Sequence, residues 1–191
     1  LLENGCGIQG RVAYVSQRPW IQNATFKDNI PFSHPYDAKR FNQVLHCCSL
    51  ERDISLLDAG INTELGERGV NLSGGQASRL CLARATYAAL SYPPGEAVII
   101  LDDVLSAVDA PVAEHIYRHN ILQLLRNTTR ILVTHHISLA SRLGGVSCWV
   151  NIQGRRSNSQ SRKDLHKRLN TNPTYSDVAS QSLSQYSLQP Q

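Results

Sequence analysis

The sequence predicts an α/β protein built on a parallel sheet. Three short β-prone runs, at residues 11–16, 97–101 and 130–134, alternate with segments whose apolar residues recur at helical spacing. The second run is wholly apolar, which is typical of a strand buried on both faces. Alternation of strands and helices implies parallel pairing with right-handed crossovers. We therefore expect helices on both faces of the sheet.

The loop after the first β-prone run carries two apolar side chains. Gln17, Arg18 and Pro19 end the run, because polar residues and proline interrupt a strand pattern. Trp20 and Ile21 come next. Two interpretations of this pair stay open: both residues are core anchors, or they form an apolar contact surface for another domain.

Two helices are predicted in the following segment. Asp37 is a typical N-cap, and the apolar spacing after it predicts an amphipathic helix over 38–50. A shorter helix is expected over about 51–58, and a polar, glycine-containing loop covers 62–70.

A serine and two glycines open the next predicted helix, which runs to about Ala89. Ser73 lies three residues before Gln76, a spacing that fits a capping box. Gly74 and Gly75 leave the backbone open to a large anion. A helix N-terminus favours phosphate because it presents free N–H groups and the positive end of the dipole. A plain Gly-Gly turn before an ordinary helix is the alternative interpretation.

Acidic residues follow the second predicted strand, and a histidine follows the third. Asp102 and Asp103 stand where ligand sites of open α/β sheets lie. They are either members of a structural ion pair or the Mg²⁺ ligands of a phosphoryl-transfer enzyme. His135 is either a core histidine or a donor to a terminal phosphate. Asp109 lies just before Pro111, which fits the first turn of a helix. The apolar positions expected on the inner face of that helix are Val112, Ile116 and Leu122.

Composition limits the class of protein. The chain has 191 residues with 19 Lys/Arg and 15 Asp/Glu, but the basic excess lies in residues 151–191. Residues 1–150 are neutral, so they lack the positive field of a nucleic-acid binder. No apolar run approaches a membrane span, and the N-terminus has no signal-peptide pattern.

The cysteines and histidines predict neither a disulfide framework nor a metal site. The five cysteines are an odd number without C-x-x-C spacing, which indicates reduced, intracellular thiols. His115 and His119 are four residues apart and could share a metal, but no third ligand lies nearby in the sequence. A solvated helix face is therefore favoured.

Two parts of the chain differ in composition and in apolar periodicity. Residues 1–150 carry the strand and helix patterns, whereas residues 151–191 are rich in Ser, Gln, Asn and Arg. We expect a partial folded domain followed by a mostly disordered tail. The chain has no methionine and begins in mid-pattern, which predicts a fragment.

In their order and spacing, these motifs resemble the nucleotide-binding domain of ATP-binding cassette transporters over about residues 10–143. Residues 14–22 and 66–69 are similar to the first cassette of the C subfamily, the multidrug-resistance-associated exporters. That type often carries Asp where other cassettes have the catalytic Glu, and Asp103 stands there in this chain. The matching motifs are Gln17 (Q-loop), Leu72-Ser73-Gly74-Gly75-Gln76 (signature), Val98-Ile99-Ile100-Leu101-Asp102-Asp103 (Walker B), Ser106-Ala107-Val108-Asp109 (D-loop) and Thr134-His135 (switch).

The resemblance implies a P-loop NTPase-like fold with a helical signature subdomain at about 30–90, and ATP with Mg²⁺ as cofactors. It implies that Asp102 and Gln17 bind Mg²⁺, that Asp103 polarises the attacking water, and that His135 contacts the γ-phosphate. Dimers of this family are head-to-tail, so the signature motif would clamp ATP held by a second nucleotide-binding domain. The residues of that clamp would be Ser73, Gly74, Gly75 and Gln76, with Asp109 lining the interface. Trp20 and Ile21 would lie near the transmembrane domains.

The chain departs from the family in one large respect. It contains no G-x-x-x-x-G-K-[ST] loop, which is the main cradle of the β- and γ-phosphates. We therefore expect a domain that lacks its N-terminal strand and phosphate loop, and a fragment that is inactive by itself. The implied function is ATP hydrolysis that drives export, at the cytoplasmic face of a membrane. The alternatives are a soluble ATPase of the same cassette type and a non-catalytic truncated fragment.

Overall fold

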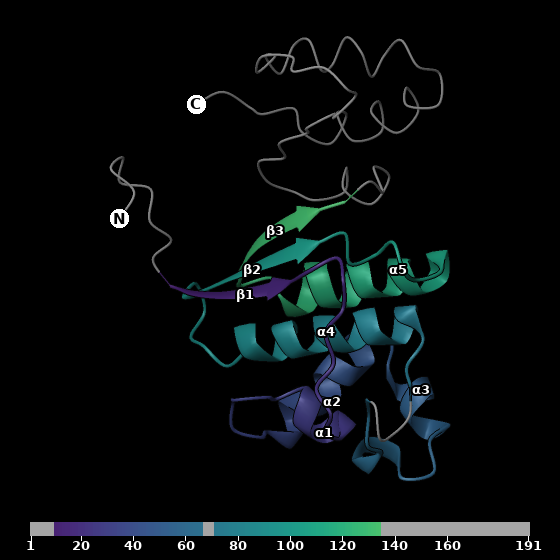
Figure 1. The fold of residues 1–191 in the computed structure, drawn as a ribbon. Helices are drawn as coiled ribbons and strands as arrows, with labels where there is room; N and C mark the ends of the chain where they lie inside the picture. The colour runs from purple at the N-terminus through teal and green to yellow at the C-terminus, as the bar shows by residue number, and fades with distance from the viewer. Residues whose placement is uncertain (1–9, 67–70, 135–191) are drawn as a thin grey trace, which may run out of the picture. The chain divides into compact units, whose positions relative to one another are not determined.

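The computed structural model describes residues 10–66 and 71–134, which contain a parallel three-stranded sheet. The strand order is β1-β2-β3, where β1 is Arg11–Val15, β2 is Ala97–Asp102 and β3 is Thr129–Val133 (Figure 1). Both pairings are parallel, with Val15 opposite Leu101 and Asp102 opposite Val133. The predicted parallel α/β class is confirmed, and all three carboxyl ends lie at the same edge.

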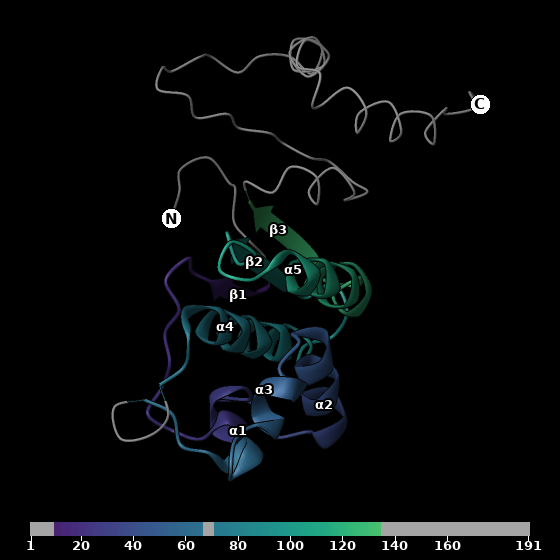
Figure 2. The same ribbon diagram turned by 90° about the vertical axis from the view of Figure 1, so that its right-hand side faces the viewer.

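One face of this sheet is covered by helices. Ala97, Ile99 and Leu101 of β2 point into the core, and α4 (Gly74–Ala89) lies along β1 and β2 on this side (Figures 1 and 2). The opposite face is apolar and open: Val12, Tyr14, Ile131 and Val133 are each about half exposed. The predicted second helical layer is not found among residues 10–66 and 71–134.

Short helices lie on the side of α4 that faces away from the sheet (Figure 2). Phe41, Val44 and Leu45 of α2 (Ala38–Cys47) are buried. Asp37 caps this helix as predicted, accepting a hydrogen bond from the Arg40 amide at 2.8 Å. A left-handed residue, Ser49 (φ 56°), follows α2, so this helix ends before the expected residue 50. The next helix, α3 (Glu51–Ser55), begins where expected but ends before residue 58. The elements of this layer are α1 (Phe26–Asn29), α2 (Ala38–Cys47), α3 (Glu51–Ser55) and the 3₁₀ turn η1 (Gly60–Asn62).

The α4 helix is the central element of the described region. It begins at a complete capping box, in which Ser73 accepts from the Gln76 amide and Gln76 accepts from the Ser73 amide. The predicted end at Ala89 is also confirmed. Leu80, Leu82 and Tyr87 are buried on different sides of the helix, because α4 packs against both the sheet and α2.

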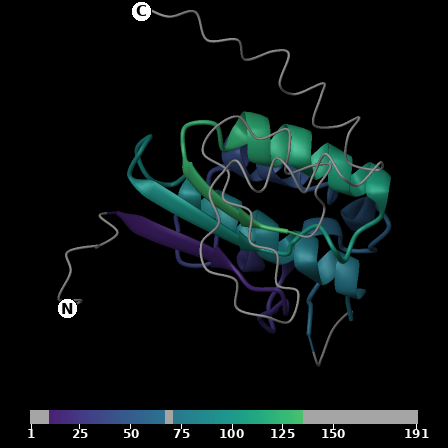
Figure 3. The same cartoon turned by 90° about the horizontal axis from the view of Figure 1, so that it is seen from above.

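The last helical segment has a different register from the one predicted. Asp109 caps α5 (Ala110–Ile116), and Pro111 lies in the first turn as expected. The chain then continues as a π-helix, η2 (Tyr117–Leu124), on the β3 side of the sheet (Figure 3). Of the predicted inner positions, Ile116 is buried, whereas Val112 of α5 and Leu122 of η2 are half-buried. The wider turn of a π-helix moves the inner face after Tyr117, which explains the outcome at Leu122. The buried residues are Ala113, Ile116, Tyr117, Asn120, Ile121 and Leu125.

Several predicted features lie outside the described residues. They are His135, the segment 67–69 and the tail at 151–191. The alternating pattern also predicts a helix at 137–143, which lies outside the described residues as well. Within the described residues, no helix has the length and apolar character needed to cross a membrane.

Candidate functional site

Three of the predicted site residues meet at the carboxyl edge of the sheet. Asp102 is the last residue of β2, Asp103 follows it, and Gln17 lies two residues after β1. The Gln17 Nε2 donates to Asp103 Oδ2 at 3.5 Å. A residue that the sequence reasoning did not include, Tyr14, donates its hydroxyl to Asp102 Oδ2 at 3.1 Å. Parallel pairing alone brings these positions together, since they terminate neighbouring strands.

Asp103 has an unusual backbone conformation at this edge. Its φ is 52°, in the left-handed region, which aspartate tolerates better than most residues but at some cost in energy. Its amide donates to Val133 O at 2.8 Å, and its carbonyl accepts from the Ser106 hydroxyl at 2.7 Å. These bonds turn the chain away from β2 and hold the Asp103 side chain beside Gln17.

The donor chemistry of this edge fits magnesium. Two carboxylates and one amide provide the oxygen ligands that Mg²⁺ prefers, and Mg²⁺ usually binds through one or two carboxylates together with substrate phosphates. No three His, Cys, Asp or Glu side chains in the described ranges form a metal site by themselves. A cation at this edge would therefore share its coordination with a phosphate ligand.

The two glycines at the start of α4 have different surroundings. A Cβ added at Gly75 would lie 2.7 Å from the carbonyl oxygen of Ala107, whereas one at Gly74 would meet no atom within 4 Å. Gly75 is therefore required by the close approach of residues 106–109. Gly74 and the exposed Ser73 leave the helix N-terminus open, as an anion-binding turn needs.

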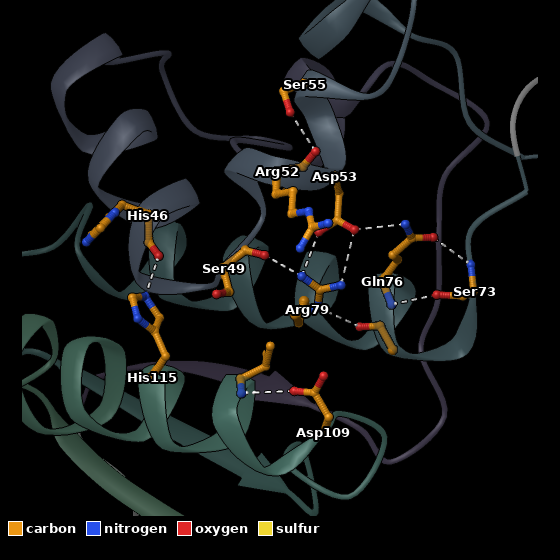
Figure 4. Close-up of polar contacts among 12 residues, drawn as sticks. His46, Ser49, Arg52, Asp53, Ser55, Ser73, Gln76, Arg79, Asp109 and His115 are labelled. Carbon is orange, nitrogen blue, oxygen red and sulfur yellow. Dashed lines mark hydrogen bonds and ion pairs between the residues drawn. The ribbon is translucent and has the colours of Figure 1, made fainter.

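Residues 73–76 at the start of α4, here called the signature turn, are also bonded to a residue of another helix. The Gln76 Nε2 donates to Asp53 Oδ1 at 2.9 Å, and Arg79 forms an ion pair with the same carboxylate (Figure 4). Asp53 comes from α3. The sequence reasoning missed Asp53 and Arg79, because no local spacing connects residues more than 20 positions apart.

The loop after Gln17 is fastened to α4. Cys81 Sγ accepts from the Trp20 amide at 3.3 Å and donates to the Trp20 carbonyl at 3.1 Å. Arg84 donates to the Trp20 carbonyl at 3.0 Å and to Asn29 Oδ1 at 2.7 Å. Asn29 is fully buried and accepts from the Gln22 amide. Burial lowers the pKa of the Arg84 guanidinium from its usual value. Because Cys81 and Arg84 both belong to α4, the hydrogen bonds above fix the position of this loop on that helix.

Trp20 is not a core residue. It is 56% exposed, and its ring meets that of Phe32 edge-on at 5.9 Å, with the Arg84 guanidinium 4.7 Å from its centroid. These residues line an open groove of about 520 Å³ beside β1. Of the two interpretations of Trp20, the exposed contact surface fits the structure.

The histidine pair has a third member that the sequence did not reveal. His115 and His119 stack with ring centroids 4.2 Å apart, and the His46 ring lies 5.3 Å from His115. The His115 Nε2 also contacts the His46 carbonyl oxygen at 2.9 Å (Figure 4). As placed, these rings form no metal site in the described part of the chain, so the cluster joins α2 to α5.

Comparison with known proteins identifies relatives over most of this chain. It is 54% identical over 139 residues to "Multidrug resistance protein mrp-7" of Caenorhabditis elegans, an alignment that covers 72% of this chain and 9% of the relative. It is 46% identical over 138 residues to "ABC transporter C family member 3" of Dictyostelium discoideum, with the same coverages. It is 46% identical over 139 residues to "ATP-binding cassette sub-family C member 3" of Homo sapiens, again covering 72% and 9%.

The chain therefore spans about 9% of the length of these relatives. No family model matches the chain. Relatives with different names agree on the same subfamily at 46–54% identity.

Proposed function

The chain belongs to the C subfamily of ATP-binding cassette transporters, and from that premise we propose that it is part of a nucleotide-binding domain that couples ATP binding and hydrolysis to solute export. The observation that carries this proposal is the meeting of Gln17 with Asp103, beside Asp102, at the carboxyl edge of a parallel sheet. Ligand sites of such sheets lie at that edge.

At this chain's own site, each side chain has a separate task. Asp102 and Gln17 would hold Mg²⁺, which supplies positive charge for the phosphates. Asp103 orients and polarises the attacking water. Its side chain is one methylene shorter than glutamate, so its carboxylate falls short of the best geometry and the site is slow. By resemblance to the family, His135 contacts the γ-phosphate.

The signature turn serves a second nucleotide-binding domain. Ser73, Gly74 and Gly75 present a hydroxyl and backbone N–H groups to the γ-phosphate of ATP on that partner, in a head-to-tail dimer. The open space at Gly74 supports this role, because a phosphate can approach the backbone there. Asp109 is exposed next to the turn and lines the same interface.

The groove beside β1 receives the transmembrane domains. Trp20 and Phe32 are both about half exposed and contact each other, and exposed aromatic residues are common anchors of protein interfaces. Hydrogen bonds from Cys81 and Arg84 to Trp20 connect this surface to α4. Movement of the groove would then be transmitted to the signature turn at the start of the same helix.

The test compares the two sites in the full-length protein. Ser73→Ala weakens the partner's site, whereas Asp103→Asn weakens a site that is already slow. We expect the serine substitution to lower MgATP hydrolysis and solute transport into vesicles more than the aspartate substitution. The reverse order would overturn the assignment of the two sites. Hydrolysis without any transport would favour a soluble ATPase instead.

A further inference from the structure

Asp53 lies on α3, outside all five motifs of the cassette pattern, yet its carboxylate is bonded to the signature turn. Oδ1 accepts from Gln76 Nε2 at 2.9 Å, and Oδ2 accepts from Arg79 at 2.6 Å (Figure 4). The side chains of Asp53 and Arg79 are only 16% and 14% exposed. A mostly buried carboxylate with two such bonds holds its partners in fixed positions.

Both ends of the Gln76 amide are occupied within the chain. Its Oε1 accepts from the Ser73 amide at 2.9 Å, while its Nε2 donates to Asp53. Only one orientation of the amide satisfies both contacts, because the Ser73 N–H needs an acceptor and the carboxylate needs a donor. Gln76 therefore ties Ser73 to α3 through its side chain, and these two contacts leave the second N–H of Nε2 unused.

Arg79 balances the charge of Asp53 beside the helix N-terminus. An unpaired carboxylate at this position would repel a triphosphate that approaches the turn. Arg79 pairs with it and also donates to the carbonyl oxygens of Gly75, at 3.3 Å, and Ser49. The pair is neutral as a unit, so the positive end of the α4 dipole stays available to an anion.

We propose that Asp53 is a positioning residue for nucleotide recognition by the signature turn. Through Gln76 it fixes the Ser73 backbone, and through Arg79 its own charge is cancelled. Gln76 then acts by holding the turn in place. This inference rests on the proposed function, since it deepens the role of the signature turn given above.

The experiment measures two quantities in the full-length protein: amide hydrogen exchange at residues 74–77 and the KM for MgATP against kcat. Asp53→Ala should speed exchange at the turn and raise KM about tenfold, the size expected for one lost charge-assisted hydrogen bond. Its kcat should change little. Asp53→Asn keeps an oxygen acceptor for Gln76 but turns its NH₂ group towards Arg79, so it should recover only part of the KM. Asp58→Ala, which changes an exposed carboxylate on the same segment, is the matched control and should leave both quantities unchanged.

The outcomes separate this inference from the proposed function. If Ser73→Ala raises KM but Asp53→Ala behaves like the Asp58 control, the inference is overturned and the proposed function stands. If Asp53→Ala lowers thermal stability without a change in turn exchange or KM, Asp53 is only structural and the inference is again overturned. If Ser73→Ala leaves the MgATP dependence unchanged, the proposed function fails and the inference fails with it.

Discussion

Two glutamines of this chain, Gln17 and Gln76, are held in opposite ways. Gln17 is exposed and reaches Asp103 through a long contact of 3.5 Å. Gln76 is bonded at both ends of its amide, at 2.9 Å to the Ser73 amide and at 2.9 Å to Asp53. The same type of side chain is therefore used in two ways: Gln17 is loosely held, whereas Gln76 fixes the backbone around it.

The largest expected effect concerns the loop after Gln17, which is firmly bonded to α4 although Gln17 itself is loosely held. Arg84 donates at 2.8 Å to the Asn29 carbonyl, at 2.7 Å to Asn29 Oδ1 and at 3.0 Å to the Trp20 carbonyl. Arg84→Met keeps the aliphatic part of the side chain but removes these bonds. We expect a loss of about 2–4 kcal/mol in the free energy of unfolding, because partly buried acceptors lose charged donors.

Urea denaturation measures this loss, and in a Trp149→Phe background the fluorescence of Trp20 reports the loop. Arg18→Met, which changes an exposed arginine of the same loop, should stay within about 0.5 kcal/mol of the parent. Equal unfolding midpoints for Arg84→Met and Arg18→Met would show that the loop is not fastened to α4 in the way described.

The two glycines of the signature turn give the next largest difference. Gly75→Ala places a Cβ 2.7 Å from the Ala107 carbonyl oxygen, so we expect a loss of about 1–3 kcal/mol from overpacking. Gly74→Ala meets open space and should be neutral or slightly stabilising in a helix first turn. Thermal unfolding of the two variants is the measurement. A larger loss for Gly74→Ala would contradict the contact between the turn and residues 106–109.

Substitution of the two glutamines themselves tests the opening contrast directly. Gln76→Ala removes two hydrogen bonds and should lower the free energy of unfolding by about 1–2 kcal/mol. Gln17→Ala removes one long, exposed contact and should stay within about 0.5 kcal/mol of the parent. Denaturant titrations of the pair, fitted with a shared slope, separate the two cases. Similar losses for both variants would mean that Gln17 is as firmly held as Gln76.

The parts of this structure that depend on local spacing could be predicted from the sequence. The capping box of Ser73 and Gln76, the N-caps Asp37 and Asp109, and the parallel strands all depend on residues a few positions apart or on continuous apolar runs. The convergence of Gln17 with Asp103 followed from the order of strand ends.

The parts that depend on long-range packing could not be predicted. Asp53 meets Gln76 across 23 positions, and Arg84 meets Asn29 across 55 positions. No periodicity records such pairs, because they form only when helices from different segments pack together. The register after Tyr117 was wrong for a different reason: a π-helix changes the spacing of the buried face.

The smallest expected effect concerns nucleotide binding by the 191-residue chain alone. Its strand edge carries oxygen donors of the kind that Mg²⁺ prefers, but the sequence contains no G-x-x-x-x-G-K-[ST] loop to bind the β- and γ-phosphates. Neither glutamine compensates, because Gln17 is loosely held and Gln76 is engaged within the chain. Calorimetric titration with MgATP should give no saturable heat, and Asp102→Asn should leave the trace unchanged. Tight binding that Asp102→Asn abolishes would mean that the strand edge alone can hold the nucleotide. It would contradict the inference that neither Gln17 nor Gln76 compensates for the missing loop.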